Sequence, residues 1–411
     1  MTRLDRRGWR PRTRRGSRPG TMAKAALAVL LAGVTLACTA APPPAHTGGV
    51  DPDAAPRATE AAYAEHGPFD VGVLTVEVEP GRRAEVWYPA PAGSSAGRTH
   101  DTYHLRDAFP RALDALLPAG LDPTFTTDAV RELAAAPGRF PMVLFSHGFG
   151  SFRSQSSMLT THLASWGFVV LSPDYIERGL GGLWPAPGVP NRPESEVVDL
   201  TLAAAMSLDR GPGLLEGRID TSRLFPVGHS AGGWASTRIA GERTDVSSWI
   251  SLSFGLAAPP VSIGDLSLVP PALRDPAKAG MWITGADDRI VPVERVEDAY
   301  AATSGERKLV VVPRSGHNNA MTDLCEVGRD KGGLVGTAAA AGLFFPPLIV
   351  TLAQDGCLPP AAPSPEVWPI VRHFVTAELR YRAGLDPEPV GLGSGVVDRF
   401  GDLAPTYLHD E

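Results

Sequence analysis

The sequence predicts a doubly wound α/β fold, with a mostly parallel sheet of about eight strands and helices on both faces. Short, uninterrupted apolar runs recur along the chain, which is typical of parallel strands buried on both faces. These runs alternate with longer segments whose apolar residues have helical spacing. The sequence shows no internal repeat. We therefore expect a single domain over residues 67–411, with a C-terminal elaboration around residues 325–365.

Eight segments are predicted to form the strands. The first two, residues 71–78 and 83–88, are separated by Glu79-Pro80-Gly81, which is a turn signal. The other six are short apolar runs. They cover residues 141–146, 168–172, 224–227, 249–252, 281–284 and 309–312.

Helices are predicted between these strands and near the end of the chain. Residues 194–209 illustrate the pattern, because their apolar side chains fall on one helical face. The predicted helices cover residues 109–117, 127–136, 154–166, 194–209, 231–243 and 366–382.

Residues 1–38 are predicted to be an export signal. They carry eight arginines and one lysine against a single aspartate, and residues 25–37 form an apolar run. This run is too short to span a bilayer, which takes about 20 residues, but it is typical of a secretory signal peptide. The residues before Cys38 resemble a bacterial lipoprotein box, so a lipidated Cys38 that anchors the protein to a membrane is an alternative. Two arginine pairs leave twin-arginine export open, and Met22 is an alternative start.

Residues 39–66 are rich in Pro, Ala and Gly and are predicted to form a tether. Beyond the signal region the chain holds two cysteines, Cys325 and Cys357. In an oxidising compartment such a pair usually forms a disulfide. Two buried free thiols are the alternative.

The part of the chain after the signal region is acidic. The 411 residues have a net charge of −7, but residues 39–411 hold 29 basic and 44 acidic side chains, a net charge of −15. Nucleic-acid binding depends on neutralising phosphates with Lys and Arg, so this class of function is excluded. The acidity also disfavours attraction to anionic lipid headgroups. We expect a monomer.

A candidate nucleophile lies in Gly228-His229-Ser230-Ala231-Gly232, which has the pattern G-x-S-x-G. The pattern is weak alone, but here it follows the predicted strand 224–227 and opens the predicted helix 231–243. This strand–turn–helix context is that of a nucleophile elbow, which exposes a serine at the top of a sheet. An ordinary glycine-rich turn is the alternative interpretation.

A serine hydroxyl needs a base that removes its proton, and the base needs an orienting acid. Asp288 follows the predicted strand 281–284, and Asp287 is the alternative acid. His317 lies in a glycine-flanked loop after the predicted strand 309–312 and is the candidate base. His147 and His229 lie within the motifs themselves and are predicted to be structural.

An oxyanion hole needs two preorganised N–H donors. The amide of Ala231 is the first candidate, because it directly follows Ser230 at a predicted helix N-terminus. The second candidate is the amide of Phe149, in the loop His147-Gly148-Phe149-Gly150 after the predicted strand 141–146.

Several of these motifs resemble the platelet-activating-factor acetylhydrolase branch of the α/β-hydrolases. The resemblance rests on the sequences VWYP, FSHGFG, LASWGFVV, GHSAGG and HNNAMTDL at residues 86–89, 145–150, 163–170, 228–233 and 317–324. The order Ser230, Asp288, His317 is also that of an α/β-hydrolase. Dienelactone hydrolases, chlorophyllases and bacterial polyester hydrolases share much of the pattern. The resemblance covers roughly residues 67–325, and the segment 325–365 departs from it.

The resemblance implies the α/β-hydrolase fold and an exported serine carboxylic-ester hydrolase without metal or cofactor. Its substrates would be short-chain or lipid-like esters, cleaved through an acyl-enzyme. In this reading His317 takes the proton of Ser230 and Asp288 orients His317. The amides of Phe149 and Ala231 would stabilise the oxyanion.

Three alternatives remain open: a serine peptidase or amidase on the same fold, a polyester hydrolase, and a non-catalytic surface lipoprotein. The last has least support, because a binding protein does not need the serine, acid, histidine and both glycine loops together. Phe149, Phe152, Trp184 and Trp234 are candidate residues for the wall of an acyl pocket. The segment 325–365 is expected to shape the substrate entrance.

Overall fold

The computed structural model describes residues 61–109, 114–115, 117–183, 189–256, 270–340, 342 and 344–411. The predicted signal peptide, most of the predicted tether and Trp184 lie outside these residues. Packing begins inside the predicted tether, at the short 3-10 helix η1 (Ala62–Ala64), where Tyr63 is buried and its hydroxyl donates to Asp386. None of the described helices is long and apolar enough to cross a membrane.

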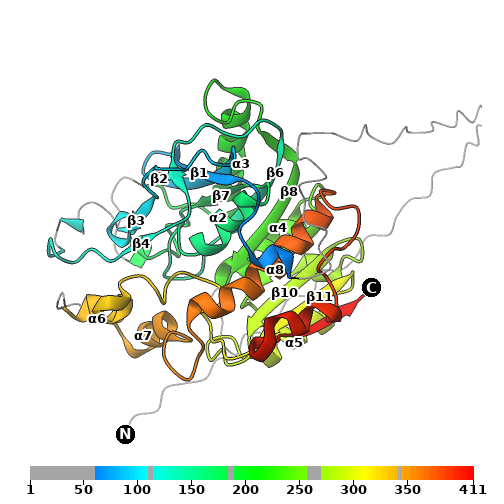
Figure 1. The fold of residues 1–411 in the computed structure, drawn as a ribbon. Helices are drawn as coiled ribbons and strands as arrows, with labels where there is room; N and C mark the ends of the chain where they lie inside the picture. Colours follow the sequence, from blue (N-terminus) through cyan, green and yellow to red (C-terminus); the bar gives the residue numbers. More distant parts are fainter. Residues whose placement is uncertain are drawn as a thin grey trace, which may run out of the picture. The chain divides into compact units, whose positions relative to one another are not determined.

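The main sheet confirms the predicted α/β class (Figure 1). Its strand order is β12-β11-β10-β9-β8-β6-β7-β2-β1-β5. The six strands from β7 to β11 are parallel to one another, whereas β2 is antiparallel to both β1 and β7. The strands are β1 (Asp70–Glu79), β2 (Arg82–Ala90), β5 (Val130–Arg131), β6 (Phe140–Ser146), β7 (Val169–Pro173), β8 (Ile219–His229), β9 (Ser248–Leu252), β10 (Ala279–Gly285), β11 (Arg307–Val312) and β12 (Thr406–Asp410).

The eight predicted strands are the eight central strands of this sheet, and the two unpredicted strands are its edges. β12 is largely exposed and polar, so it lacks the apolar run by which a buried strand is recognised. β5 has only two residues and pairs with β1. The helix predicted over residues 127–136 is wrong: this segment is extended, and its buried Val130 and Leu133 pack beside Ala90.

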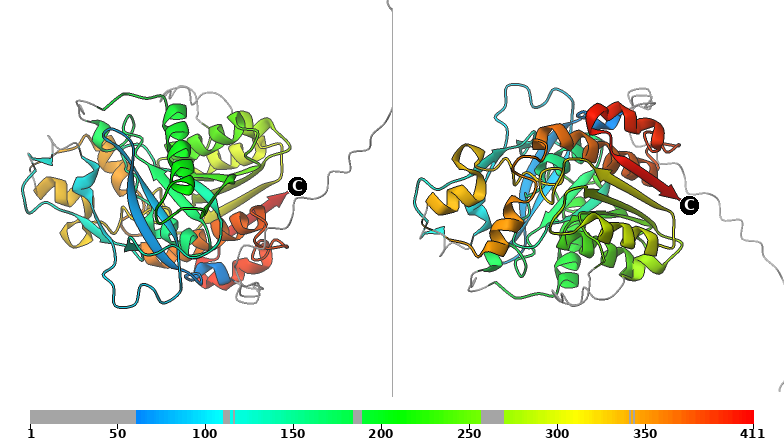
Figure 2. Two further views of the ribbon diagram at one scale, coloured as in Figure 1. Left: turned by 90° about the horizontal axis from the view of Figure 1, so that it is seen from above. Right: turned by 90° about the horizontal axis from the view of Figure 1, so that it is seen from below.

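Helices cover both faces of the sheet (Figure 2). Along β6, Val143 and Phe145 face the core beneath α2 and α8, whereas Met142 and Leu144 face the core beneath α3, α4 and α5. This period of two is that of a strand buried on both sides. The helices are α2 (Ser157–Ser165), α3 (Glu194–Arg210), α4 (Ala231–Glu242), α5 (Val293–Ala302) and α8 (Ser364–Arg382).

A smaller group of elements lies beside one end of the sheet. Helices α6 (Gly333–Ala340) and α7 (Pro347–Gln354) lie near the two-stranded sheet of β3 (Thr102–His104) and β4 (Thr124–Thr126) in Figures 1 and 2. The predicted disulfide is confirmed: Cys325 and Cys357 are bonded, and the segment that they close contains both helices.

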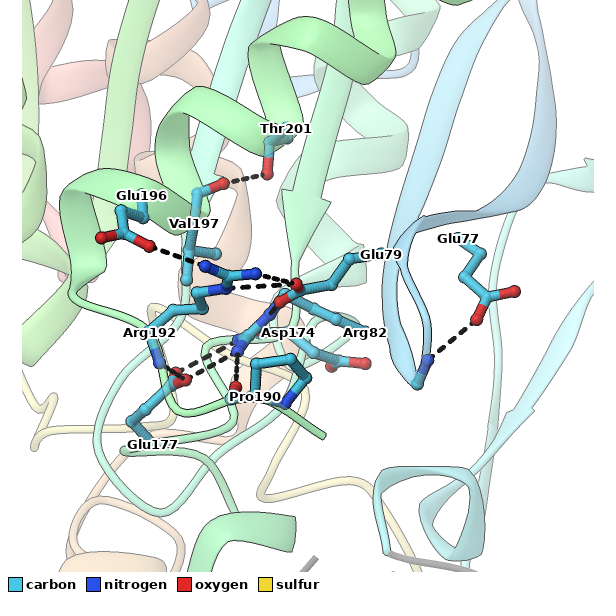
Figure 3. A network of polar contacts seen from close by, with 11 residues as sticks. Glu77, Glu79, Arg82, Asp174, Glu177, Pro190, Arg192, Glu196, Val197 and Thr201 are labelled. Carbon is cyan, nitrogen blue, oxygen red and sulfur yellow. Dashed lines mark hydrogen bonds and ion pairs between the residues drawn. The ribbon is translucent and has the colours of Figure 1, made fainter. Parts of the chain in front are cut away.

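A network of ion pairs fixes the turn between β1 and β2 (Figure 3). The Arg82 side chain is fully buried and bonds to Glu79 at 2.8 Å and to Glu177 at 2.6 Å. Arg192, just before α3, also bonds to Glu79, at 2.9 Å. Burial alone would raise the pKa of Glu79, but hydrogen bonds from Arg82 and Arg192 hold it below its usual range. The network thereby joins the β1–β2 hairpin to the segment that leads into α3.

Candidate active site

Ser230 lies on the sharp turn between β8 and α4. Its φ of 55° is in the left-handed region, which is strained for a residue with a side chain. The two flanking glycines are required by close packing. A Cβ on Gly228 would lie 2.0 Å from the Gly232 carbonyl oxygen, and one on Gly232 would lie 1.8 Å from the Ser146 carbonyl oxygen. The local structure is therefore the predicted strand–turn–helix elbow.

His317 and Asp288 form a buried pair. His317 Nδ1 lies 2.8 Å from Asp288 Oδ2, and neither side chain is appreciably exposed. A carboxylate only accepts hydrogen bonds, so Nδ1 of His317 carries the proton that it donates to Asp288. Nε2 is buried and has no hydrogen-bond partner in the described part of the chain. This leaves it available to a group in the adjoining pocket.

The structure brings Asp288, and not Asp287, to the histidine. Asp288 Oδ1 accepts the amides of Ile290 and Val291 at 2.9 and 2.7 Å, so both carboxylate oxygens are engaged. Asp287 is exposed on the same loop. The turn that follows β10 thus fixes which of the two neighbouring carboxylates faces inward.

The loop after β6 lies close to Ser230. A Cβ on Gly148 would lie 3.3 Å from Ser230 Cβ. The Gly148 amide donates to Gln155 Oε1 and the Gly150 amide to the Arg178 carbonyl oxygen. The Phe149 amide between them has no partner within the described ranges.

The other candidate donor, the amide of Ala231, belongs to the first residue of α4. N–H groups in the first turn of a helix have no acceptor within that helix. Together with the loop after β6, the N-terminus of α4 therefore places two available backbone donors beside the serine.

Gln155 and His229 link the loop after β6 to the end of β8 and to the His317 loop. Gln155 is fully buried; its Oε1 accepts from Gly148, and its Nε2 lies 3.0 Å from His229 Nδ1. His229 Nε2 lies 2.9 Å from the His317 carbonyl oxygen. Burial, together with the nearby His317, lowers the pKa of His229 well below its usual value, so its ring stays neutral. His229 thus connects the end of β8 to the His317 loop.

His147 has a similar supporting place. Its Nε2 accepts the Tyr175 amide at 3.0 Å and its Nδ1 lies 2.9 Å from the Gly148 carbonyl oxygen. Burial, helped by the charge of Arg178, lowers its pKa to about 3. Neither His147 nor His229 competes with His317 as the base.

Ser230 and His317 open into an apolar pocket. Its space measures about 1030 Å³, including the opening to solvent. Besides the residues of the site and Leu180, it is lined by residues within 105–109, 117–123, 334–338 and 345–353. The apolar side chains that face it include Leu105, Phe109, Leu117, Leu121, Phe149, Phe152, Leu180, Leu334, Val335, Phe345, Ile349 and Leu352.

Two of the four predicted wall residues, Phe149 and Phe152, line the pocket. Trp184 lies outside the described residues. Trp234 is placed elsewhere, since its ring packs against Phe254 in the core beneath α4. The expectation that segment 325–365 shapes the substrate entrance agrees with the pocket, because residues of α6 and α7 line it. The part of the wall formed by residues 105–109 and 117–123 was not predicted.

No cluster of three or more His, Cys, Asp or Glu side chains that could hold a metal ion occurs among the described residues. The polar residues that line the pocket are Arg106, Ser151, Gln155, His229, Ser230, His317, Asn318 and Thr337.

The sheet order and the elbow match the α/β-hydrolase fold. The family model for platelet-activating factor acetylhydrolase, isoform II, matches residues 121–179. Cutinase 1 of Thermobifida cellulosilytica is 28% identical over 157 residues, which are 35% of this chain and 56% of the cutinase. The bis(hydroxyethyl) terephthalate hydrolase of Streptomyces coelicolor is 29% identical over 171 residues, 40% of this chain and 47% of that protein.

Among solved structures, a ferulic acid esterase from Streptomyces cinnamoneus aligns with a TM-score of 0.51 and 22% identity. The alignment covers 83% of this chain and 96% of the esterase, and at this identity it speaks for the fold alone. The chain spans about half the length of the curated relatives it matches. The chain thus has the α/β-hydrolase fold and resembles serine esterases.

Proposed function

We propose that the chain is an exported serine hydrolase of carboxylic esters that works through an acyl-enzyme. One observation carries the proposal: Ser230 on its elbow and His317, which is paired with the buried Asp288, line the same apolar pocket. An apolar pocket with a few convergent polar groups is the usual form of a small-molecule site.

In the proposed reaction, His317 Nε2 removes the proton of the Ser230 hydroxyl as its oxygen attacks the ester carbonyl carbon. Asp288 holds the ring in the required tautomer and stabilises the imidazolium that forms. The amides of Phe149 and Ala231 stabilise the oxyanion. His317 then protonates the leaving alcohol, and a water molecule that His317 deprotonates releases the acid from Ser230.

The pocket supports esters with an apolar acyl group, either short-chain or lipid-like. Its walls offer leucine, phenylalanine, valine and isoleucine side chains to the substrate. A polyester hydrolase is the second candidate, because the curated relatives include cutinases and a bis(hydroxyethyl) terephthalate hydrolase. Hydrolysis of polyester film by the purified protein would favour this candidate.

Export is supported by the basic and apolar segments over residues 1–38 and by the Cys325–Cys357 disulfide, which suits an oxidising compartment. Membrane anchoring through Cys38 remains the alternative to release. Metabolic labelling with a palmitate analogue, compared between the unaltered protein and Cys38→Ala, distinguishes the two.

The test of the catalytic assignment is Ser230→Ala. We expect this variant to lose hydrolysis of p-nitrophenyl butyrate to the background rate, because the remaining groups have no nucleophile to activate. A fluorophosphonate probe should label the unaltered protein and not the variant. Circular dichroism and thermal unfolding of the variant are the control, and they should show that it is folded. Ester hydrolysis that persists in folded Ser230→Ala would refute the proposal.

A further inference from the structure

Asp355 is a buried carboxylate that does not belong to the proposed Ser230–His317–Asp288 triad. It contacts the loop that carries Asp288 and the loop that carries His317. Its Oδ2 accepts the backbone amide of His317 at 2.9 Å and that of Arg289 at 3.2 Å. Arg289 directly follows Asp288. One oxygen atom therefore joins the loop after β10 to the loop after β11, at the residues that hold the acid and the base.

Further contacts of Asp355 strengthen this junction. Its carbonyl oxygen accepts the amide of Asn318 at 3.1 Å and Asn318 Nδ2 at 3.1 Å. Its Oδ1 lies 3.3 Å from Arg289 Nε, but that arginine is 76% exposed, so the ion pair adds little. The Asp355 side chain itself is only 2% exposed, so its bonds to the two amides are protected from water.

The backbone beside Asp355 also packs closely against the His317 loop. A Cβ on Gly316 would lie 2.6 Å from the Gly356 nitrogen. Gly356 has a φ of 84°, and a Cβ there would lie 2.4 Å from Asn319 Oδ1. The positions of residues 316–319 and 355–356 are thus mutually determined.

Asp355 reaches this place at the end of the disulfide-closed segment. It directly follows α7 and lies two residues before Cys357, whose partner Cys325 lies eight residues after His317. The two cysteine Cα atoms are 4.9 Å apart. Without the covalent bond, the segment that carries Asp355 would be held to the His317 loop by noncovalent contacts alone.

We propose that Asp355 is a positioning residue for the His317–Asp288 pair, and that the Cys325–Cys357 disulfide holds Asp355 in place. The proposal rests on the proposed ester hydrolysis. Asp355 touches neither the pocket nor the reacting atoms; it acts through the backbone that carries them. It therefore governs the rate of the chemical step more than substrate binding.

The first experiment replaces Asp355 with asparagine, which keeps the shape and one oxygen but removes the negative charge that strengthens the two hydrogen bonds to the amides of His317 and Arg289. We expect kcat for p-nitrophenyl butyrate to fall about 10- to 100-fold, since small displacements of catalytic groups are this costly. KM should change less than about twofold, because the pocket is intact. Labelling by the fluorophosphonate probe should slow in parallel with kcat. Asp355→Ala should be slower still.

Asp330→Asn is the matched control, because Asp330 is an exposed carboxylate within the same disulfide-closed segment. This control should keep kcat within about twofold. Thermal unfolding of each variant distinguishes a folded protein in which His317 is displaced from a protein that does not fold. A folded Asp355→Ala with the kcat of the unaltered protein would overturn the proposal, as would an increase of KM at constant kcat.

The second experiment reduces the disulfide with dithiothreitol, which yields two cysteine thiols and the cyclic oxidised reagent. We expect kcat of the unaltered protein to fall and to recover on reoxidation, and expect Cys325→Ser/Cys357→Ser to be insensitive to the reagent. Reduction should slow Asp355→Ala much less than the unaltered protein, because both changes release the same contact. If reduction and Asp355→Ala lowered kcat by independent factors that multiply, the proposed role of the disulfide would be overturned.

The two proposals fail in different ways. Unaltered protein without Ser230-dependent hydrolysis overturns the proposed function. Normal hydrolysis by the unaltered protein and by folded Asp355→Ala overturns only the positioning role.

Discussion

At the scale of single residues, the site depends on backbone positions that only particular neighbours permit. The positive φ of Ser230 costs about 1–3 kcal/mol, and the surrounding structure must offset this. The Ser230 amide donates to the Leu252 carbonyl oxygen at 2.8 Å, and the Gly233 amide donates to the Ser230 carbonyl oxygen at 2.8 Å. These bonds fix the strained turn at both ends and hold the serine above the sheet.

Asp288→Asn tests the orientation of His317. An amide nitrogen directed at Nδ1 would favour the tautomer with its proton on Nε2, which cannot accept the serine proton. We expect kcat/KM for p-nitrophenyl butyrate to fall about 10³- to 10⁴-fold, with an unchanged fold. Asp287→Asn is the control and should retain activity, because Asp287 is exposed. The opposite ranking of the two variants would show that Asp287 is the acid.

At the scale of elements, α8 combines apolar packing with buried polar groups. His373 is fully buried on this helix, and its Nε2 lies 2.8 Å from the Gly391 carbonyl oxygen. Burial lowers its pKa to about 4. In the folded protein the ring is therefore neutral between pH 4 and about 6.5, whereas in the unfolded chain it takes up a proton over this interval.

The low pKa of His373 predicts a pH dependence of stability. Because the pKa of His373 is lower in the folded protein than in the unfolded chain, the contribution of this residue to the free energy of unfolding is fully present above pH 6.5. That contribution is lost as the pH falls towards 4. At about 1.4 kcal/mol per pH unit, the loss reaches about 3 kcal/mol at pH 4. His373→Gln should remove this part of the slope in urea unfolding measured from pH 7 to pH 4.

The control for this prediction is His100→Gln, because His100 is exposed and its Nδ1 contacts a backbone carbonyl oxygen, that of Thr127, rather than a carboxylate. It should unfold with the pH dependence of the unaltered protein. Other groups contribute equally to both variants, so the difference between the two slopes isolates His373. Equal slopes for His373→Gln and His100→Gln would contradict the prediction.

At the scale of the whole molecule, the sequence predicted the strands and the proposed catalytic residues better than the pocket beside them. Eight strands were recognisable because burial on both faces demands apolar runs, and Ser230, Asp288 and His317 became candidates because each follows such a strand. The part of the pocket wall within residues 105–109 and 117–123 contains no long helix or strand, so no periodicity marks it. Asp355 was missed for the same reason: its importance lies in contacts with loops that are distant in sequence.

The pocket predicts a dependence on acyl length that one side chain can alter. Leu334 lies in α6 and lines the pocket, so Leu334→Trp should shorten the space for the acyl chain. We expect kcat/KM for p-nitrophenyl octanoate to fall about tenfold relative to that for the acetate, since a few methylene contacts are worth this much.

Leu348→Trp is the control for the pocket variant. Leu348 lies on α7 but is 72% exposed and does not line the pocket. This variant should keep the octanoate-to-acetate ratio of the unaltered protein. A ratio that is unchanged in Leu334→Trp would mean that the acyl chain lies elsewhere.

The disulfide-closed segment also has a consequence for how this fold can diversify. Its ends are pinned 4.9 Å apart, so residues of α6 and α7 can be exchanged without moving the strands on either side, provided that Asp355 and Gly356 are kept for their contacts with the His317 loop. We expect α6 and α7 to act as an exchangeable unit that alters what the pocket accepts, while Ser230, His317 and Asp288 keep their places at the ends of the strands. Chimeras that graft this unit between hydrolases of the same fold would transfer selectivity between them.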